Sequence, residues 1–316
     1  MSVLNKIARG KGRSFGGWRQ IAVRPKVKAA IAVGPVAALL FAVILSRSDG
    51  FWRGGSSTAE DLQFTRSLAE AARSAERSPS PVRVAVFGLD GTDCAALGEL
   101  PRVLDAERQF VWEVVRAADV CLGRLRGFDV AVFPGGRARR QAAELDDDGR
   151  RAVRHFVCEG GGFVGICGGA FLATDAYDVG VLKADVLSGM VDVPGEGQKS
   201  LQERGAGTVQ IAFNDAGREV FPDSNAVSIW YSGGPIFLRE IGEKPCRFTA
   251  LATYVSEVCQ WDPQRGTMIG TPAIVAARFG KGTVIAFSPH PEMTNKTEGL
   301  LRFAVLASAR GRDLSK

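Results

Sequence analysis

The stretch Phe163-Val164-Gly165-Ile166-Cys167-Gly168-Gly169 places a cysteine between an apolar run and the small-residue segment AFLAT, residues 170–174. The apolar run predicts a buried strand, and AFLAT predicts a helix. Glycines two residues to either side of Cys167 permit a sharp strand-to-helix turn, where larger side chains would collide. The helix that follows points N–H groups at the thiol, which favours the reactive thiolate. The stretch therefore predicts a nucleophile position in a site of the α/β-hydrolase type.

Short apolar runs alternate with helical patterns along the rest of the chain. The predicted strands are residues 82–88, 110–115, 128–133, 163–166, 208–213, 226–230, 249–255, 273–279 and 282–288, and the predicted helices are residues 93–104, 146–159 and 298–309. Repeated strand–helix–strand units form parallel sheets with helices on both faces. The sequence therefore predicts an α/β fold with a doubly wound, mainly parallel sheet.

A glycine pair, Gly135-Gly136, ends the strand that precedes the Cys167 strand. Neighbouring parallel strands end at the same edge of a sheet, so we expect this turn beside Cys167. Its unhindered N–H groups, with that of Gly168, are suited to binding a developing oxyanion. An ordinary glycine-rich turn is the alternative interpretation.

A base and an acid follow the last predicted strand as His290-Pro291-Glu292. A nucleophilic cysteine needs a base, and the base needs a carboxylate to orient it. Pro291 stiffens the backbone between the two side chains. The segment therefore predicts a Cys167–His290–Glu292 triad. His155, the other histidine, falls inside a charged helical pattern and is expected to be partly exposed.

The N-terminal region carries the basic charge of the chain. The formal net charge is +6, but residues 1–28 hold eight Lys and Arg and no acidic residue, so the rest is close to neutral. Residues 29–46 are uncharged and predict a transmembrane anchor, near the roughly 20 residues that span a bilayer. The flanking charges predict a cytoplasmic N-terminus and an extracytoplasmic main domain. A cleaved signal peptide, an organelle-targeting presequence and a buried core helix are the alternatives.

The chain is expected to divide into five parts. These are a basic segment (1–28), the anchor (29–46), a linker with a short helix at 59–77 (47–81), the main domain (82–309) and a tail (310–316). Ser78-Pro79-Ser80-Pro81 breaks the short helix and marks the end of the linker.

Metal and nucleic-acid functions have little support in the sequence. The six cysteines form no CxxC pair, and two histidines offer few further ligands, so no metal and no cofactor is expected. A nearly neutral body argues against nucleic acid as a partner. Cys246 and Cys259 are either free thiols or a disulfide between neighbouring strands.

A family resemblance rests on three motifs: FPGG at 133–136, GICGGA at 165–170 and SPHPE at 288–292. They resemble class I glutamine amidotransferase-like domains, and within these the biotin-protein ligase N-terminal domain-like family. That family shows a Tyr-x-Gly-Gly-Pro segment, here Tyr231-Ser232-Gly233-Gly234-Pro235. The resemblance runs from Val82 to about Ala309 and implies a flavodoxin-like three-layer sandwich. It implies Cys167 as nucleophile, His290 as base, Glu292 as orienting acid, Gly136 and Gly168 as oxyanion donors, and Tyr231, Gly233 and Gly234 as pocket residues.

Two functions fit these residues. The first is a membrane-anchored cysteine-dependent amidohydrolase that acts on a small amide or peptide through a thioester. The second is a non-catalytic binding or scaffolding domain that keeps the fold and the turn. No synthetase or ligase module follows to receive ammonia, which favours hydrolysis over amidotransfer. Gly168 stands where the related peptidase-like branch carries its histidine, which excludes that form of the triad.

Overall fold

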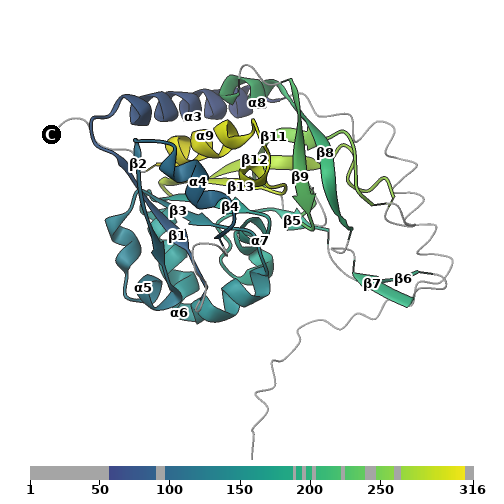
Figure 1. Ribbon diagram of the computed structural model, residues 1–316, viewed down its shortest axis with the longest axis horizontal. Coiled ribbons are helices and arrows are strands. Elements are labelled where there is room, and N and C mark those ends of the chain that lie inside the picture. The colour runs from purple at the N-terminus through teal and green to yellow at the C-terminus, as the bar shows by residue number, and fades with distance from the viewer. Residues whose placement is uncertain are drawn as a thin grey trace, which may run out of the picture. The chain divides into compact units, whose positions relative to one another are not determined.

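The computed structural model describes residues 57–89, 97–187, 190–193, 197–200, 204–221, 225–238, 247–259 and 265–309 (Figure 1). Within these ranges nine strands form one sheet, in the order β2 (Phe110–Val115), β1 (Val82–Phe87), β3 (Val130–Phe133), β4 (Gly162–Ile166), β13 (Gly282–Phe287), β12 (Pro272–Phe279), β11 (Thr249–Tyr254), β8 (Ala206–Phe213) and β9 (Ala226–Ser232). From β2 to β13 all neighbours are parallel, and from β13 to β9 all are antiparallel. The predicted α/β sheet is thus confirmed as a mixed sheet with one parallel half.

Helices cover both faces of the parallel half, as Figure 1 shows. One face carries α3 (Ala59–Arg77), α4 (Leu100–Asp105) and α9 (Glu298–Ser308), with α8 (Asp215–Val220) beside α3 over β11 and β8. The other face carries α5 (Ala117–Cys121), α6 (Ala138–Cys158) and α7 (Gly168–Leu172). Side chains alternate between the two faces of a strand. In β1, Val84 and Val86 accordingly join the first core, and Ala85 and Phe87 join the second.

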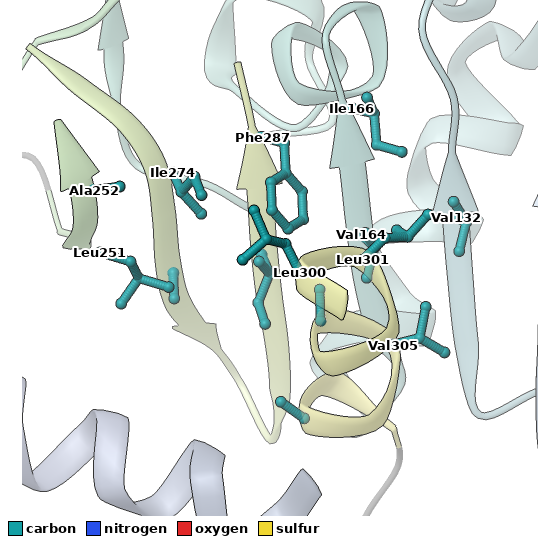
Figure 2. Packing of buried hydrophobic residues seen from close by; sticks show 14 of the residues in the cluster. Val132, Val164, Ile166, Leu251, Ala252, Ile274, Phe287, Leu300, Leu301 and Val305 are labelled. Carbon is teal, nitrogen blue, oxygen red and sulfur yellow. The ribbon is translucent and has the colours of Figure 1, made fainter. Parts of the chain in front are cut away.

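The first core is centred on α9 and the middle of the sheet (Figure 2). Leu300, Leu301 and Val305 of α9 lie over Phe287 of β13 and Val164 of β4. All five side chains are at most 5% exposed. Burying an aliphatic or phenylalanine side chain of this kind stabilises a fold by about 1.5–3 kcal/mol. The apolar runs of the sequence therefore form the core in which α9 packs against β4 and β13.

Short elements complete the described chain. They are the 3-10 turns η2 (Arg124–Gly127), η3 (Asp175–Tyr177) and η4 (Pro291–Met293), the pair β5 (Asp185–Val186) with β10 (Phe237–Leu238), and the pair β6 (Met190–Val193) with β7 (Gly197–Ser200). The apolar and turn patterns of the sequence do not predict the two small pairs, because each strand is only two to four residues long.

The helix at 59–77, expected in the linker, has the predicted bounds and contributes to the first core. Thr58 and Asp61 form a reciprocal capping box at its N-terminus. Leu68 and Ala72 are buried, and the helix packs against α9 and α8. The helix is thus part of the packed unit.

Two predicted helices have other bounds. The helix expected at 93–104 begins at Leu100 as α4; residues 93–96 lie outside the described ranges. Gly98 has a φ of +64°, and Pro101 favours a helix start. The helix expected at 146–159 is the second part of α6, which starts at a kink at Asp146; the first part, from Ala138, was not expected. Asp146 interrupts α6 with a φ of 50°, and its Oδ1 accepts the N–H of Asp148 at 2.8 Å. The acidic residues predicted at a helix start therefore cap the second part of α6, at the kink in this helix.

The predicted anchor at 29–46 lies outside the described residues. Among the helices of the described ranges, none combines the length and the apolar character that a bilayer crossing requires. The expected α/β fold is therefore confirmed for the described residues, which begin at Ser57.

Candidate active site

Cys167 occupies a strained turn between β4 and α7. Its φ of 49° and ψ of −103° are unusual for a residue with a side chain. Such a conformation costs on the order of 1–3 kcal/mol and is often found at functional sites. A Cβ on Gly168 would lie 2.1 Å from the carbonyl oxygen of Gly136, and one on Gly169 would lie 1.9 Å from that of Phe133. Glycine is therefore required at both positions for α7 to pack against the end of β3.

Three parallel strands end together at this turn. Phe133 of β3 is paired with Gly165, and Phe287 of β13 with Ile166. The predicted turn at Gly135 and the segment that carries His290 thus emerge at the same sheet edge as Cys167. Ligands of open α/β sheets bind outside the carboxyl ends of the strands, as expected for this position.

His290 is fixed by its backbone and by a carboxylate. Its N–H donates to the Trp230 carbonyl at 2.7 Å, which ties the segment after β13 to β9. Its Nδ1 lies 2.7 Å from Glu292 Oε1. His290 is 7% exposed and Glu292 is 4% exposed. The structure therefore brings the predicted base and acid together in a buried pair, with the other ring nitrogen left for a second partner.

Cys167 also acts on the protonation of His290. Burial lowers the pKa of His290, but hydrogen bonds to Cys167 and Glu292, together with the charges of both, outweigh burial and raise it to about 10. Gly135 adjoins both side chains: a Cβ there would lie 2.7 Å from His290 Cε1 and 3.7 Å from Cys167 Cβ. A protonated imidazole beside the sulfur is the form that can give a proton to a leaving group.

The N–H groups predicted for an oxyanion also lie at this turn. Gly136 has a φ of +124°, which favours glycine. Among the turns, loops and caps of the described residues, neither Gly136 nor Gly168 donates its N–H to a backbone carbonyl. Gly168 is the first residue of α7, where an N–H has no partner within the helix. Both groups are thus available to a bound oxygen.

The end of β9 reaches the thiol from the antiparallel half of the sheet. Cys167 Sγ lies 3.3 Å from the Ser232 carbonyl oxygen. Gly233 follows with a φ of +66°, and a Cβ on Gly234 would lie 1.9 Å from the Ser288 carbonyl oxygen. Tyr231 through Gly234 therefore pack closely beside the nucleophile position. Ser232 has no signal in the sequence beyond its place between Tyr231 and the glycines.

Tyr231 anchors this segment from the core. Its hydroxyl donates to the Gly234 carbonyl at 2.9 Å, and its ring packs edge-on against Tyr254 at 5.9 Å. The Tyr254 hydroxyl donates to Ser288 Oγ at 2.6 Å. Burial is the main cause that raises the pKa of Tyr231 to about 12. Tyr254 and Ser288 were not predicted as site residues, because only the register of β11, β12 and β13 places them here.

The remaining cysteines lie elsewhere or are only partly described. Cys121 and Cys158 are exposed, whereas Cys259 is buried. Cys246 lies outside the described residues, so the disulfide considered for Cys246 and Cys259 stays a prediction. Within the described ranges, no three His, Cys, Asp or Glu side chains gather as a metal site would require.

Comparison with known families gives one match over most of the described domain. The model of the family described as biotin-protein ligase, N terminal, matches residues 127–303, more than half of the chain. This range contains Cys167, His290 and Glu292. No curated protein matches the sequence significantly.

Solved structures match this chain at low identity and with TM-scores below 0.5. A cytoplasmic protein of Salmonella typhimurium LT2 is 14% identical, with a TM-score of 0.47 over 72% of this chain and 100% of its own. A glutamine amidotransferase of Thermotoga maritima is 14% identical, with a TM-score of 0.46 over 72% of this chain and 98% of its own. A β-galactosidase of Rahnella sp. R3 is also 14% identical, with a TM-score of 0.44 over 72% of this chain and 31% of its own.

Proposed function

Since this chain belongs to the biotin-protein ligase N-terminal family, we propose that its amidotransferase-like domain is a cysteine-dependent hydrolase of a small amide or peptide. The observation that carries the proposal is the buried His290–Glu292 pair, 2.7 Å between Nδ1 and Oε1, at the same glycine turn as Cys167. A binding or scaffolding domain would need neither the strained turn nor a base and an acid beside it.

The proposed reaction has two halves. In the first, the Cys167 sulfur attacks the carbonyl carbon, and the carbonyl oxygen takes the negative charge beside the N–H groups of Gly136 and Gly168. His290 gives its proton to the leaving amine as the C–N bond breaks, which leaves a thioester on Cys167. In the second half, His290 takes a proton from water and the hydroxide attacks the thioester. The C–S bond then breaks, and the acid product leaves with the thiolate of Cys167 and the imidazolium of His290 restored.

Glu292 holds the ring of His290 through these steps. Its Oε1 contacts Nδ1, which fixes the ring orientation and stabilises the protonated form. Its Oε2 is buried and has no hydrogen-bond partner among the described residues. We assign Glu292 to positioning the imidazole, because the 2.7 Å contact engages His290 directly.

An activated ester tests the acylation half without knowledge of the natural substrate. The full chain is mixed with p-nitrophenyl acetate, and release of p-nitrophenolate is followed. We expect Cys167→Ala to abolish the protein-dependent rate and His290→Ala to lower it by at least about 100-fold, the lower bound for loss of a general acid or base. Glu292→Gln should fall between His290→Ala and wild type.

Cys121→Ala is the matched control, since Cys121 is exposed and lies on α5, away from the turn. This variant should retain the wild-type rate. Equal rates in wild type, Cys167→Ala and His290→Ala would refute the catalytic proposal and leave the binding domain as the function.

A further inference from the structure

Arg204 is a buried cation for which no ion pair is found among the described residues. Its side chain is 2% exposed, and it is the largest fully buried side chain of the described residues. All three guanidinium nitrogens, Nε, Nη1 and Nη2, lack a hydrogen-bond partner within the described chain. Burial of an unpaired charge is unfavourable, so a counter-charge is expected where such a residue is kept.

The chain path places Arg204 next to the active site. It precedes β8 by two residues, and the first residue of β8, Ala206, is paired with Ser232. The carbonyl of Ser232 lies 3.3 Å from the Cys167 sulfur. The next pair, Gly207 with Tyr231, places the anchor tyrosine beside the same segment.

The pKa values of two neighbouring tyrosines also place the Arg204 guanidinium close to the active site. Burial raises the pKa of Tyr231, and the Arg204 guanidinium lowers it in part through its charge and a hydrogen-bonding contact with the hydroxyl. The charge of Arg204 also lowers the pKa of Tyr254 in part. Cys167 acts on the same two hydroxyls. The guanidinium therefore lies within electrostatic reach of the tyrosine pair that adjoins Cys167, yet no well-formed hydrogen bond satisfies it.

We propose that Arg204 binds a carboxylate of the substrate, so that the site selects amides that carry a free carboxylate near the scissile carbonyl. A guanidinium can hold both oxygens of a carboxylate through parallel N–H donors. Arg204 is the only buried Lys or Arg among the described residues, which suits one negative charge better than a phosphate dianion. That the substrate is an amide rests on the proposed function. That it carries a carboxylate rests on Arg204 alone.

Two alkylating reagents of nearly equal size distinguish an effect of the reagent's charge from an effect on the reactivity of Cys167. Iodoacetate carries a carboxylate where iodoacetamide carries a neutral amide; with both, the Cys167 sulfur forms a C–S bond and iodide leaves with the C–I electron pair. The alkylation rate at Cys167 in the full chain is measured by peptide mass spectrometry for each reagent. We expect Arg204→Met to lower the iodoacetate/iodoacetamide rate ratio by about tenfold or more, the loss of one charge-assisted hydrogen-bonded contact.

Arg204→Lys keeps the charge without the planar fork and should lower the ratio less than Arg204→Met. Arg278→Met is the matched control, because Arg278 lies on the surface over Phe64 of α3 and should leave the ratio unchanged. A buried cation without a partner is often replaced by an apolar side chain at no cost in stability. Arg204→Met should thus unfold at or above the wild-type temperature.

A ratio unchanged in Arg204→Met would overturn the proposal. A marked fall in its unfolding temperature would do the same, since it would show that Arg204 has a structural partner. Failure of the proposed function has another signature, in which His290→Ala leaves both alkylation rates at Cys167 unchanged. The ratio of the two reagents still reports on Arg204 in that case.

Discussion

His290 is held between a carboxylate and a thiol, and this setting couples its proton to the folded state. Both partners favour the imidazolium, and together they outweigh the burial that opposes it. The pKa of about 10 in the folded chain lies above the ordinary value of 6.5. Between these values the native chain holds a proton that the unfolded chain releases. The stabilisation from His290 is therefore complete below about pH 6.5 and is lost as the pH rises towards 10.

Stability should accordingly fall with rising pH through this window. We expect the free energy of unfolding, measured by urea denaturation from pH 6.5 to 10, to fall by up to about 1.4 kcal/mol per pH unit through His290. His290→Gln should flatten the profile, and Cys167→Ala should reduce its slope because one of the two partners is gone.

His155→Gln controls for the substitution itself. His155 is exposed on α6, so its variant should keep the wild-type profile. A wild-type profile no steeper than that of His290→Gln would contradict the buried imidazolium.

Some residues of the site could be predicted from the sequence, and others could not. Cys167, His290 and Glu292 stand in short motifs after apolar strands, so their neighbourhood follows from the rule that parallel strands end at one edge. Ser232 and Ser288 contact the site through backbone and register, which no local pattern encodes. Arg204 precedes a strand in a Gly-rich stretch, and only its burial marks it.

At the scale of elements, the turn between β4 and α7 depends on the close approach of two backbones. Gly169 faces the Phe133 carbonyl, with no room for a Cβ. The same crowding holds the Gly135-Gly136 turn against Cys167. The sequence predicts this turn because glycines flank the cysteine. It does not predict the first part of α6, which ends at the kink where Asp146 caps the second part.

Gly169→Ala should therefore destabilise the fold. The added methyl group must displace the end of β3, and we expect a loss of about 1–3 kcal/mol in the free energy of unfolding, as for other overpacked sites. Urea denaturation measures the loss.

Gly299→Ala is the control for helix propensity. Gly299 lies in α9, and nothing lies within 4 Å of a Cβ placed there. The substitution should stabilise the chain by about 0.5–1 kcal/mol. A Gly169→Ala variant as stable as wild type would contradict the packed turn.

At the scale of the whole molecule, the active site lies where the two halves of the sheet meet. β13 pairs with β4 in parallel and with β12 in antiparallel fashion, and His290 follows β13. The sequence predicts the strands of both halves, but their order across the sheet depends on long-range pairing. The strand patterns therefore predict the parallel half but not the approach of β9 to Cys167, which only the family resemblance implies through Tyr231, Gly233 and Gly234.

The charge pattern of residues 1–46 makes a separate prediction for the full chain. We propose that it anchors the domain on the extracytoplasmic side. In sealed vesicles whose cytoplasmic face is outward, added protease should leave residues 82–309 intact until detergent opens the vesicles. Digestion before detergent is added would refute this orientation.

In the proposed reaction, Cys167 carries the acyl group with His290 as its partner. The most direct measurement is the site of acetylation after a short exposure of the full chain to p-nitrophenyl acetate, read by peptide mass spectrometry. We predict that the acetyl group is on Cys167 in the wild-type chain and largely absent from it in His290→Ala, with the exposed Cys121 and Cys158 little modified in both. Acetylation of Cys121 and Cys158 ahead of Cys167, unchanged in His290→Ala, would contradict the account.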